Sequence, residues 1–135
     1  MTDKAIIFSD GGARGNPGPA GIGAVIYDKD KNILAEVSKF IGVSTNNQAE
    51  YKALIEALKK AIELKISEVE AYLDSELVVK QLNREYKVKN KDIAPLFLEV
   101  YNLSQQFKSI KFFHVRREQN KEADRLANLA MDKGF

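Results

Sequence analysis

The chain has 135 residues, no cysteine and a formal net charge of +2. Its length suits a single domain, so we expect residues 1–135 to form one unit with its own core. The lack of cysteine excludes a disulfide framework and a thiolate metal site. No apolar run approaches the roughly 20 residues of a membrane span, and the first strand begins too early for a signal peptide, so we expect a cytoplasmic protein with no membrane partner.

The first predicted strand covers residues 4–10 and ends in an acid. With a period of two, Ile6, Phe8 and Asp10 fall on one side, so the carboxylate points where apolar side chains point. An unpaired buried carboxylate is costly, and we expect a cation, a hydrogen-bond donor or a metal to meet it. Glycines and prolines over residues 8–21 predict a loop, and the alternative is that Asp10 simply belongs to a glycine-rich turn.

Residues 21–27 and 33–41 are β-rich and are joined by a polar turn of hairpin length. Together with the first strand they predict an antiparallel meander. A helix then begins, with Thr45 as its N-cap and Gln48 completing a capping box, and it extends to about residue 64. Glu50 lies at the edge of the apolar stripe of this helix, so a second carboxylate leans inward.

The second half of the chain alternates strands with helices. A short strand over residues 69–74 ends in Asp74, and its place after a long helix predicts that it lies parallel to an earlier strand. Two helices, over residues 75–83 and 92–107, flank a basic connector at 84–91. A strand over residues 111–115 and a helix over 119–133 complete the chain. Asp124 adjoins the predicted inward face of this last helix, which comprises Ala123, Leu126, Ala127, Leu129 and Ala130.

Four inward acids, Asp10, Glu50, Asp74 and Asp124, come from two strand ends and two helix faces that a mixed sheet can bring to one edge. Four converging carboxylates repel one another and require cations. An all-oxygen site suits Mg²⁺ or Mn²⁺ far better than Zn²⁺, and two such ions about 4 Å apart promote phosphoryl displacement. The alternative is that a chain with 19 acidic residues places some of them near apolar stripes by chance.

Several motifs occur in order along nearly the whole chain: Ser9–Gly12, Gly15–Gly18, Thr45–Glu50, Asp74–Ser75, Tyr86–Asn90, Asn120–Asp124 and Leu126–Ala127. On these motifs the sequence resembles a type 1 ribonuclease H. The resemblance implies an α/β fold of the ribonuclease H-like class. It consists of a five-stranded mixed sheet with strands 1–3 antiparallel and with helices on both faces.

The resemblance also implies a reaction, the endonucleolytic hydrolysis of the RNA strand of RNA–DNA hybrids with little sequence specificity. The four acids match the metal-binding and catalytic residues of the family position for position. By analogy Asp10 bridges two Mg²⁺ ions, Asp124 completes the site of the ion that activates water, and Glu50 with Asp74 completes the other site. The products would carry a 5′-phosphate and a 3′-hydroxyl, and we expect a monomer.

Further residues gain roles from the same comparison. The expected hybrid contacts are Gly11, Asn16, Thr45, Asn46, Asn47 and Asn90. Thr45 and Asn90 among them would grip a DNA phosphate, although Thr45 also reads as a plain helix cap. Additional phosphate contacts would come from Arg14, Lys87, Lys89 and Lys91, although lysines of a surface loop are often only solvated.

Three departures limit the analogy. The one histidine, His114, falls within a predicted strand rather than in a loop before the last acid, so we interpret it as structural. Glu76 stands where some relatives carry glutamine, and the connector at 84–91 is too short for an extra helix and basic protrusion. We also expect no N-terminal hybrid-binding module, and therefore a modest affinity for the hybrid.

Two rival hypotheses remain open at this point. An integrase, a resolvase or a proofreading exonuclease also uses an acid cluster, but the run Thr45–Asn47 argues against these classes. A non-catalytic hybrid-binding module would keep the fold and the groove residues while losing one or more acids, and all four acids are present here.

Overall fold

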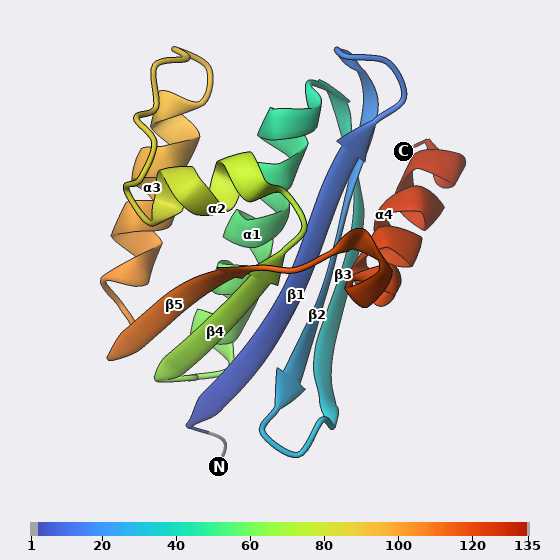
Figure 1. Cartoon of the computed structure of the whole chain (residues 1–135). Helices are drawn as coiled ribbons and strands as arrows, with labels where there is room; N and C mark the ends of the chain where they lie inside the picture. The colour runs from blue at the N-terminus through green and yellow to red at the C-terminus, as the bar shows by residue number, and fades with distance from the viewer. Residues whose placement is uncertain (1–2, 135) are drawn as a thin grey trace.

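The computed structural model describes residues 3–134. Five strands form one sheet in the order β3-β2-β1-β4-β5 (Figure 1). Their bounds are β1 Lys4–Ala13, β2 Gly18–Asp28, β3 Ile33–Ser44, β4 Glu68–Leu73 and β5 Ser109–His114. The first three strands are antiparallel neighbours, while β4 is parallel to β1 and β5 is parallel to β4. The predicted fold class and the parallel placement of β4 are confirmed.

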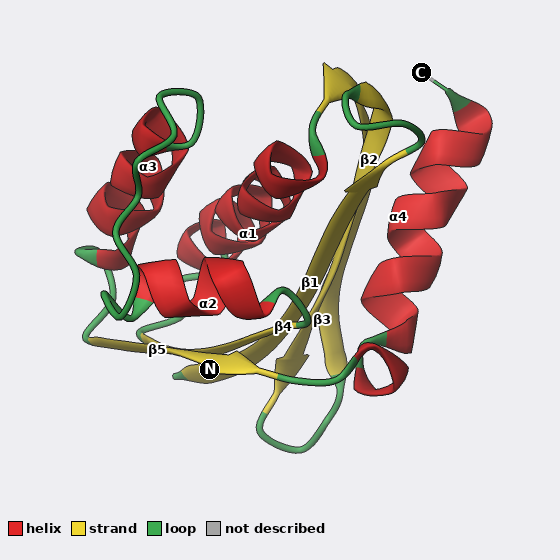
Figure 2. Cartoon of the chain, turned by 45° about the horizontal axis from the view of Figure 1, so that its top comes forward, coloured by secondary structure: helices red, strands yellow, loops and turns green. Residues whose placement is uncertain are grey.

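Helices cover both faces of this sheet, as expected. Their bounds are α1 Asn46–Glu63, α2 Glu76–Leu82, α3 Ala94–Ser104 and α4 Lys121–Lys133, with a short 3-10 helix, η1 Arg117–Gln119, before α4. Figure 2 shows α1, α2 and α3 on one side of the sheet and α4 on the other. Among the helices within residues 3–134, none combines the length and the apolar character needed to span a bilayer.

The strand β1 lies in the middle of the sheet, between β2 and β4. Its side chains Ala5, Ile7 and Ser9 are fully buried, and Ile6 and Phe8 on the opposite side are partly exposed. Asp10 lies on the same side as Phe8, as the alternation predicted, and is only 7% exposed. The main core therefore forms between the sheet and α1, and Asp10 faces the side that α4 covers.

The predicted loop over residues 8–21 is wrong. The strand β1 continues through Asp10 to Ala13, and β2 begins at Gly18, so only residues 14–17 connect the two strands. Gly11 pairs with Ile22, and Gly12 pairs with Gly21, within the antiparallel ladder. Asp10 consequently lies inside a strand instead of at its end.

The glycines of this region serve close packing. A Cβ on Gly11 would lie 2.2 Å from the carbonyl oxygen of Ala49 in α1, and a Cβ on Gly23 would lie 2.3 Å from that of Ala123 in α4. Gly23 is the ladder partner of Asp10. Two helices thus reach the sheet beside Asp10 from opposite faces because no side chain holds them away.

Some other boundaries differ from the sequence-based expectations. The helix α3 is shorter than predicted, and the last helix begins only at Lys121, after η1. Leu129 was expected to face inward but is 37% exposed, because it lies on the edge of α4 away from the sheet contact made by Leu126, Ala127 and Ala130. The capping box of Thr45 and Gln48 is confirmed.

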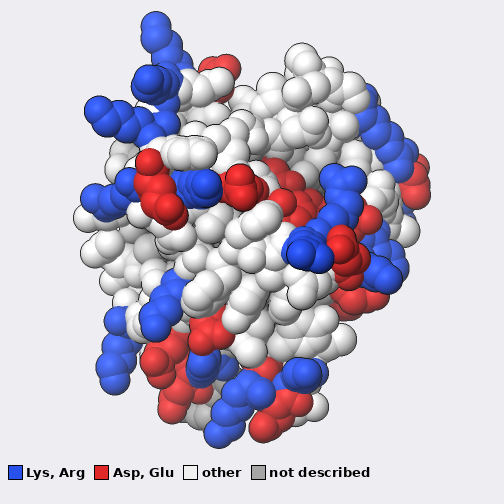
Figure 3. Space-filling model, in the orientation of Figure 1, with Lys and Arg blue, Asp and Glu red and all other residues white. Residues whose placement is uncertain are grey.

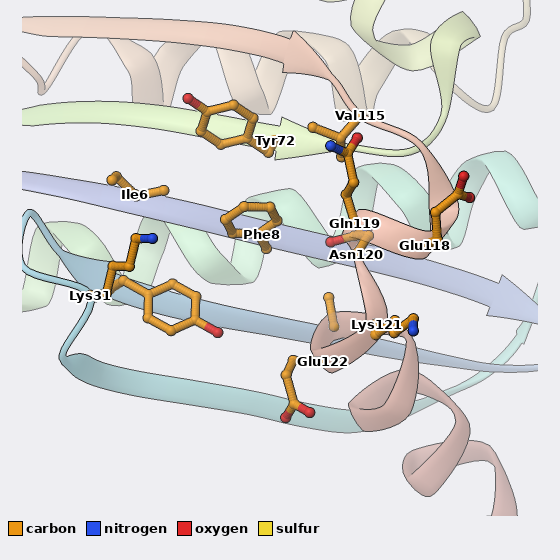
Figure 4. A pocket seen from close by; sticks show the side chains of 12 residues that line it. Ile6, Phe8, Lys31, Tyr72, Val115, Glu118, Gln119, Asn120, Lys121 and Glu122 are labelled. Carbon is orange, nitrogen blue, oxygen red and sulfur yellow. The ribbon is translucent and has the colours of Figure 1, made fainter.

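The part of the sheet that α4 leaves open carries an aromatic row. Phe8 and Tyr72 stack with ring centroids 5.0 Å apart, and Tyr72 and Phe113 stack at 5.2 Å. Figure 4 shows Phe8 and Tyr72 on neighbouring strands beside the start of α4. Because these rings pack against one another across three strands, they reinforce the parallel pairing of β1, β4 and β5.

The packing at Gly23 gives a stability prediction. Gly23→Ala should lower the free energy of unfolding by about 2 kcal/mol, because α4 must shift to admit the methyl group. Gly12→Ala is the matched control, since its Cβ would meet Met131 Cε only at 3.8 Å, and it should change stability by less than about 1 kcal/mol. Urea denaturation measures both values. Equal losses in the two variants would contradict the close contact with α4.

Candidate active site

The four predicted acids line one pocket beside the central strands β1 and β4. Asp10, Glu50 and Asp74 each contribute one carboxylate oxygen to a group in which the three oxygens lie within 4.8 Å of one another. Asp124, in the first turn of α4, lines the same pocket without belonging to this group of three. Figure 3 shows acidic side chains in a hollow on this face, with basic side chains on either side of it.

Each acid reaches the pocket through a different element. Asp10 projects from β1, and Asp74 directly follows the last residue of β4. Glu50 is held by α1, whose approach depends on Gly11, and Asp124 is held by α4, whose approach depends on Gly23. The site therefore assembles only when the sheet and both helices are in place.

Burial raises the free-energy cost of keeping Asp10 and Glu50 ionised. Asp10 and Glu50 are 7% and 8% exposed. Burial, followed by the nearby charges of Asp74 and Asp124, raises the pKa of Asp10 to about 7. Burial, and then the charge of Asp10, raises the pKa of Glu50 well above its ordinary value. The repulsion expected from the sequence is therefore present when no ion compensates it.

The donor set fits a divalent cation. Glu50 Oε1 accepts a hydrogen bond of 3.4 Å from the main-chain nitrogen of Gly11, whereas Glu50 Oε2 is buried without any hydrogen-bond partner in residues 3–134. A buried, unpaired carboxylate oxygen beside two further carboxylates needs a cation. Because these ligands are all oxygens, the cluster suits a hard ion such as Mg²⁺ or Mn²⁺.

Several of the predicted substrate residues adjoin the acids. Gly11, Arg14, Asn46 and Asn47 line the same pocket. Asn46 Oδ1 accepts a hydrogen bond of 2.9 Å from the nitrogen of Ala13, and the nitrogen of Asn46 donates to Asn16 Oδ1 at 3.0 Å. The structure thus brings Asn16 and Asn46 together. Arg14, by contrast, is already paired with Asp132 of α4.

Other predicted contacts lie outside the pocket lining. Thr45 Oγ1 accepts from the nitrogen of Gln48 at 3.1 Å, which is its capping role, and Asn90 Oδ1 accepts from the nitrogen of Asp92 at 2.7 Å. The lysines at positions 87, 89 and 91 are exposed on the connection between α2 and α3, where Figure 3 shows basic side chains. His114 is exposed at the end of β5. The functional roles of Thr45, Asn90 and the three lysines stay predictions.

The structure places at the site two residues for which the sequence pattern indicates no role. Arg117, in η1, lines the acidic pocket, and Asn120 donates a hydrogen bond of 2.9 Å to Asp74 Oδ2. Arg117 falls in the predicted loop before the last helix, and Asn120 falls at the start of the predicted helix over residues 119–133. The available signals were the motif Asn120–Asp124 and the position of both residues beside the last acid, because nothing in the pattern shows which of these side chains turn inward.

Comparisons with known proteins agree with this architecture. The model of the Reverse transcriptase-like family matches residues 8–130. The chain is 36% identical to "Ribonuclease H" of Helicobacter acinonychis, with 94% of this chain and 92% of that protein covered. It is 47% identical to "Bifunctional protein Rv2228c" of Mycobacterium tuberculosis over 96% of this chain, but it spans only 36% of that relative.

A solved structure gives the same result in three dimensions. LC11-RNase H1, crystallised in complex with an RNA/DNA hybrid, superposes with a TM-score of 0.91 at 45% identity, covering 96% of this chain and 97% of that one. The sheet order, the helices on both faces and the acids in one pocket define a protein of the ribonuclease H-like fold. Within that class, the chain belongs to the ribonuclease H family.

The raised pKa of Asp10 predicts a pH dependence of the metal-free protein. Its folded-state pKa is about 7 against an ordinary value of 3.8, so the unfolded state loses its proton first as the pH rises. The protonated Asp10 contributes its full stabilisation of the folded state below its ordinary pKa of 3.8, and this contribution is lost as the pH rises towards 7. Asp10→Asn should therefore exceed wild type in free energy of unfolding at pH 7.5 by about 1–2 kcal/mol.

Urea denaturation in EDTA between pH 4.5 and 8 measures this difference, and it should shrink as the pH falls. Asp30→Asn, which removes an exposed acid of the β2–β3 turn, controls for the loss of one negative charge. Millimolar Mg²⁺ should stabilise wild type more than Asp10→Asn, because binding to the folded state shifts the equilibrium. A lower stability of Asp10→Asn in EDTA at pH 7.5 would contradict the crowding of the acids.

Proposed function

We propose that this chain hydrolyses the RNA strand of RNA–DNA hybrids. The observation that carries the proposal is the convergence of Asp10, Glu50 and Asp74 within 4.8 Å, with Asp124 lining the same pocket. Membership of the ribonuclease H family supports it, as does the likeness to a protein crystallised with an RNA/DNA hybrid. A hybrid-binding module without activity would have no use for so costly a cluster of buried acids.

The four acids would hold two divalent ions, with Mg²⁺ as the expected metal and Mn²⁺ as a substitute. When bound, such ions activate water and neutralise charge on the leaving oxygen, which would yield a 5′-phosphate and a 3′-hydroxyl. The role of the protein itself would be to hold four carboxylates at fixed positions. The pKa values of Asp10 and Glu50 are raised without an ion, so ion binding, which favours the ionised carboxylates, would be accompanied by proton release.

The hybrid would lie across the surface beside the acidic pocket, where Asn16, Asn46 and Asn47 are found. Side-chain amides both donate and accept hydrogen bonds, so they suit the 2′-hydroxyls and base edges of a minor groove, which carries little sequence information. Thr45 and Asn90 would hold a DNA phosphate. The exposed lysines of the α2–α3 connection would add attraction to phosphates that is independent of sequence.

Arg117 is a further candidate for contact with the reacting phosphate. It lines the acidic pocket and forms no ion pair within residues 3–134, whereas Arg14 of the same pocket is paired with Asp132. A guanidinium beside a scissile phosphate binds its oxygens in a planar, two-pronged manner and stabilises charge in the transition state. We therefore assign Arg117 this role within the proposed reaction.

The decisive assay uses end-labelled RNA–DNA hybrid, RNA duplex, DNA duplex and single-stranded RNA, each with Mg²⁺ or with EDTA. Wild type should cut only the RNA strand of the hybrid, and only with the metal. Asp10→Asn should retain less than about a tenth of the rate, a loss above about 1.4 kcal/mol of transition-state stabilisation. Asp30→Asn should retain wild-type activity. Cleavage of the hybrid in EDTA, or full activity of Asp10→Asn, would refute the proposal.

The role of Arg117 is tested separately. Arg117→Ala should lower kcat on the hybrid roughly 10–100-fold, because it removes a charge that acts on the reacting phosphate. The matched control is Arg116→Ala, which removes the neighbouring exposed arginine that does not line the pocket. Steady-state kinetics of the two variants give the comparison. Similar kcat values for both would show that Arg117 contributes only general attraction.

A further inference from the structure

Asn120 lies where η1 ends and α4 begins, and it is only 1% exposed. Its side-chain nitrogen donates two hydrogen bonds of 2.9 Å, one to the carbonyl oxygen of Ser9 and one to Asp74 Oδ2. Figure 4 shows Asn120 beside the β1 ribbon, at the start of α4. One acceptor, Asp74, is itself one of the acids, and the other, Ser9, directly precedes Asp10 in β1.

This side chain does not cap its own helix. Asparagine is among the strongest N-cap residues, and Asn120 is the N-cap of α4, yet its side chain makes no capping hydrogen bond. The N-caps of α1 and α2, Thr45 and Ser75, do bond to the main-chain nitrogens of Gln48 and Val78. The amide of Asn120 is therefore directed away from the helix start and toward the acids.

The orientation of the amide is fixed by its surroundings. Asn120 Oδ1 is buried without a hydrogen-bond partner in residues 3–134. A flipped amide would set this oxygen against two acceptors, the Ser9 carbonyl and the Asp74 carboxylate, so only the observed orientation satisfies them. An unpaired buried acceptor costs free energy. A capping hydrogen bond to α4 does not offset this cost, because Asn120 makes none.

Asn120 also links two of the four acids, Asp74 and Asp124, to the main chain beside Asp10. Besides the bonds to Ser9 and Asp74, its main-chain carbonyl accepts from the nitrogen of Asp124 at 3.1 Å. Within residues 3–134, the side chain of Asp74 has no other hydrogen-bond donor. Without this amide, the Asp74 carboxylate would be free to turn away from Asp10 and Glu50.

We propose that Asn120 is a positioning residue that holds the Asp74 carboxylate toward Asp10 and Glu50 before a divalent ion binds. The kinetic consequence rests on the proposed function, while the consequence for ion binding does not. A carboxylate that is already in place loses less conformational freedom on binding, and a misplacement of about 1 Å in a reacting site can cost 100-fold in rate.

Asn120→Ser and Asn120→Asp test the proposal. Serine and aspartate rank with asparagine as N-caps, so a capping role would survive in both variants. The serine side chain is too short to reach both acceptors, and the aspartate has no donor to offer them. Both variants should lose roughly 10–100-fold in kcat on the hybrid, with KM changed less than about threefold. Asn120→Ser should also show a smaller rise in Tm on addition of Mg²⁺ than wild type.

Gln81→Ala is the control for stability alone. It removes another buried amide, which accepts a hydrogen bond of 2.8 Å from the hydroxyl of Tyr51 and does not line the acidic pocket. It should melt lower than wild type but keep kcat and the Mg²⁺-induced rise in Tm. The positioning role is overturned if Gln81→Ala loses as much kcat and Mg²⁺-induced rise in Tm as Asn120→Ser does. It is also overturned if Asn120→Ser keeps both at the wild-type level. If wild type cleaves no hybrid, the proposed function fails, and the Mg²⁺-induced shifts still decide the role of Asn120.

Discussion

The active site depends on a close approach of two helices to the sheet, one at each of two neighbouring strands. The helix α1 reaches β1 at Gly11, and α4 reaches β2 at Gly23, the ladder partner of Asp10. Neither approach leaves room for a Cβ atom, so the main chain of each helix rests on the main chain of the sheet. Glu50 and Asp124 are thereby brought to Asp10 from opposite faces, and the bonds of Asn120 add Asp74.

Much of this architecture could be predicted from the sequence. The period of two in β1 placed Asp10 on the correct side, and the capping box at Thr45 fixed the start of α1. The order of strands and helices gave the parallel pairing of β4 with β1. These features are local or follow from chain order, which is why residue patterns express them.

The failures have a common physical origin. The glycines at 11 and 12 were interpreted as loop formers, because a glycine selected for lack of a side chain and one selected for backbone freedom look alike in a sequence. Gly11 and Gly23 have ordinary strand partners, and what forbids a side chain there is a helix that lies far away in the chain. Arg117 and Asn120 were missed for a related reason, since their roles depend on where the turn before α4 directs each side chain.

The position of β1 in the sheet has a consequence for the dynamics of the site. Asp10 belongs to the middle strand, which pairs with β2 through Asp10 and with β4 as far as Ser9, whereas Asp124 belongs to α4. In native-state hydrogen exchange, amides near Asp10 should open only with global unfolding, while the amides of α4 can open in a smaller, local event. Such an opening would release Asp124 and the main chain of Asn120 and leave the pocket with three acids. The lifetime of the complete site is then set by how long α4 stays docked.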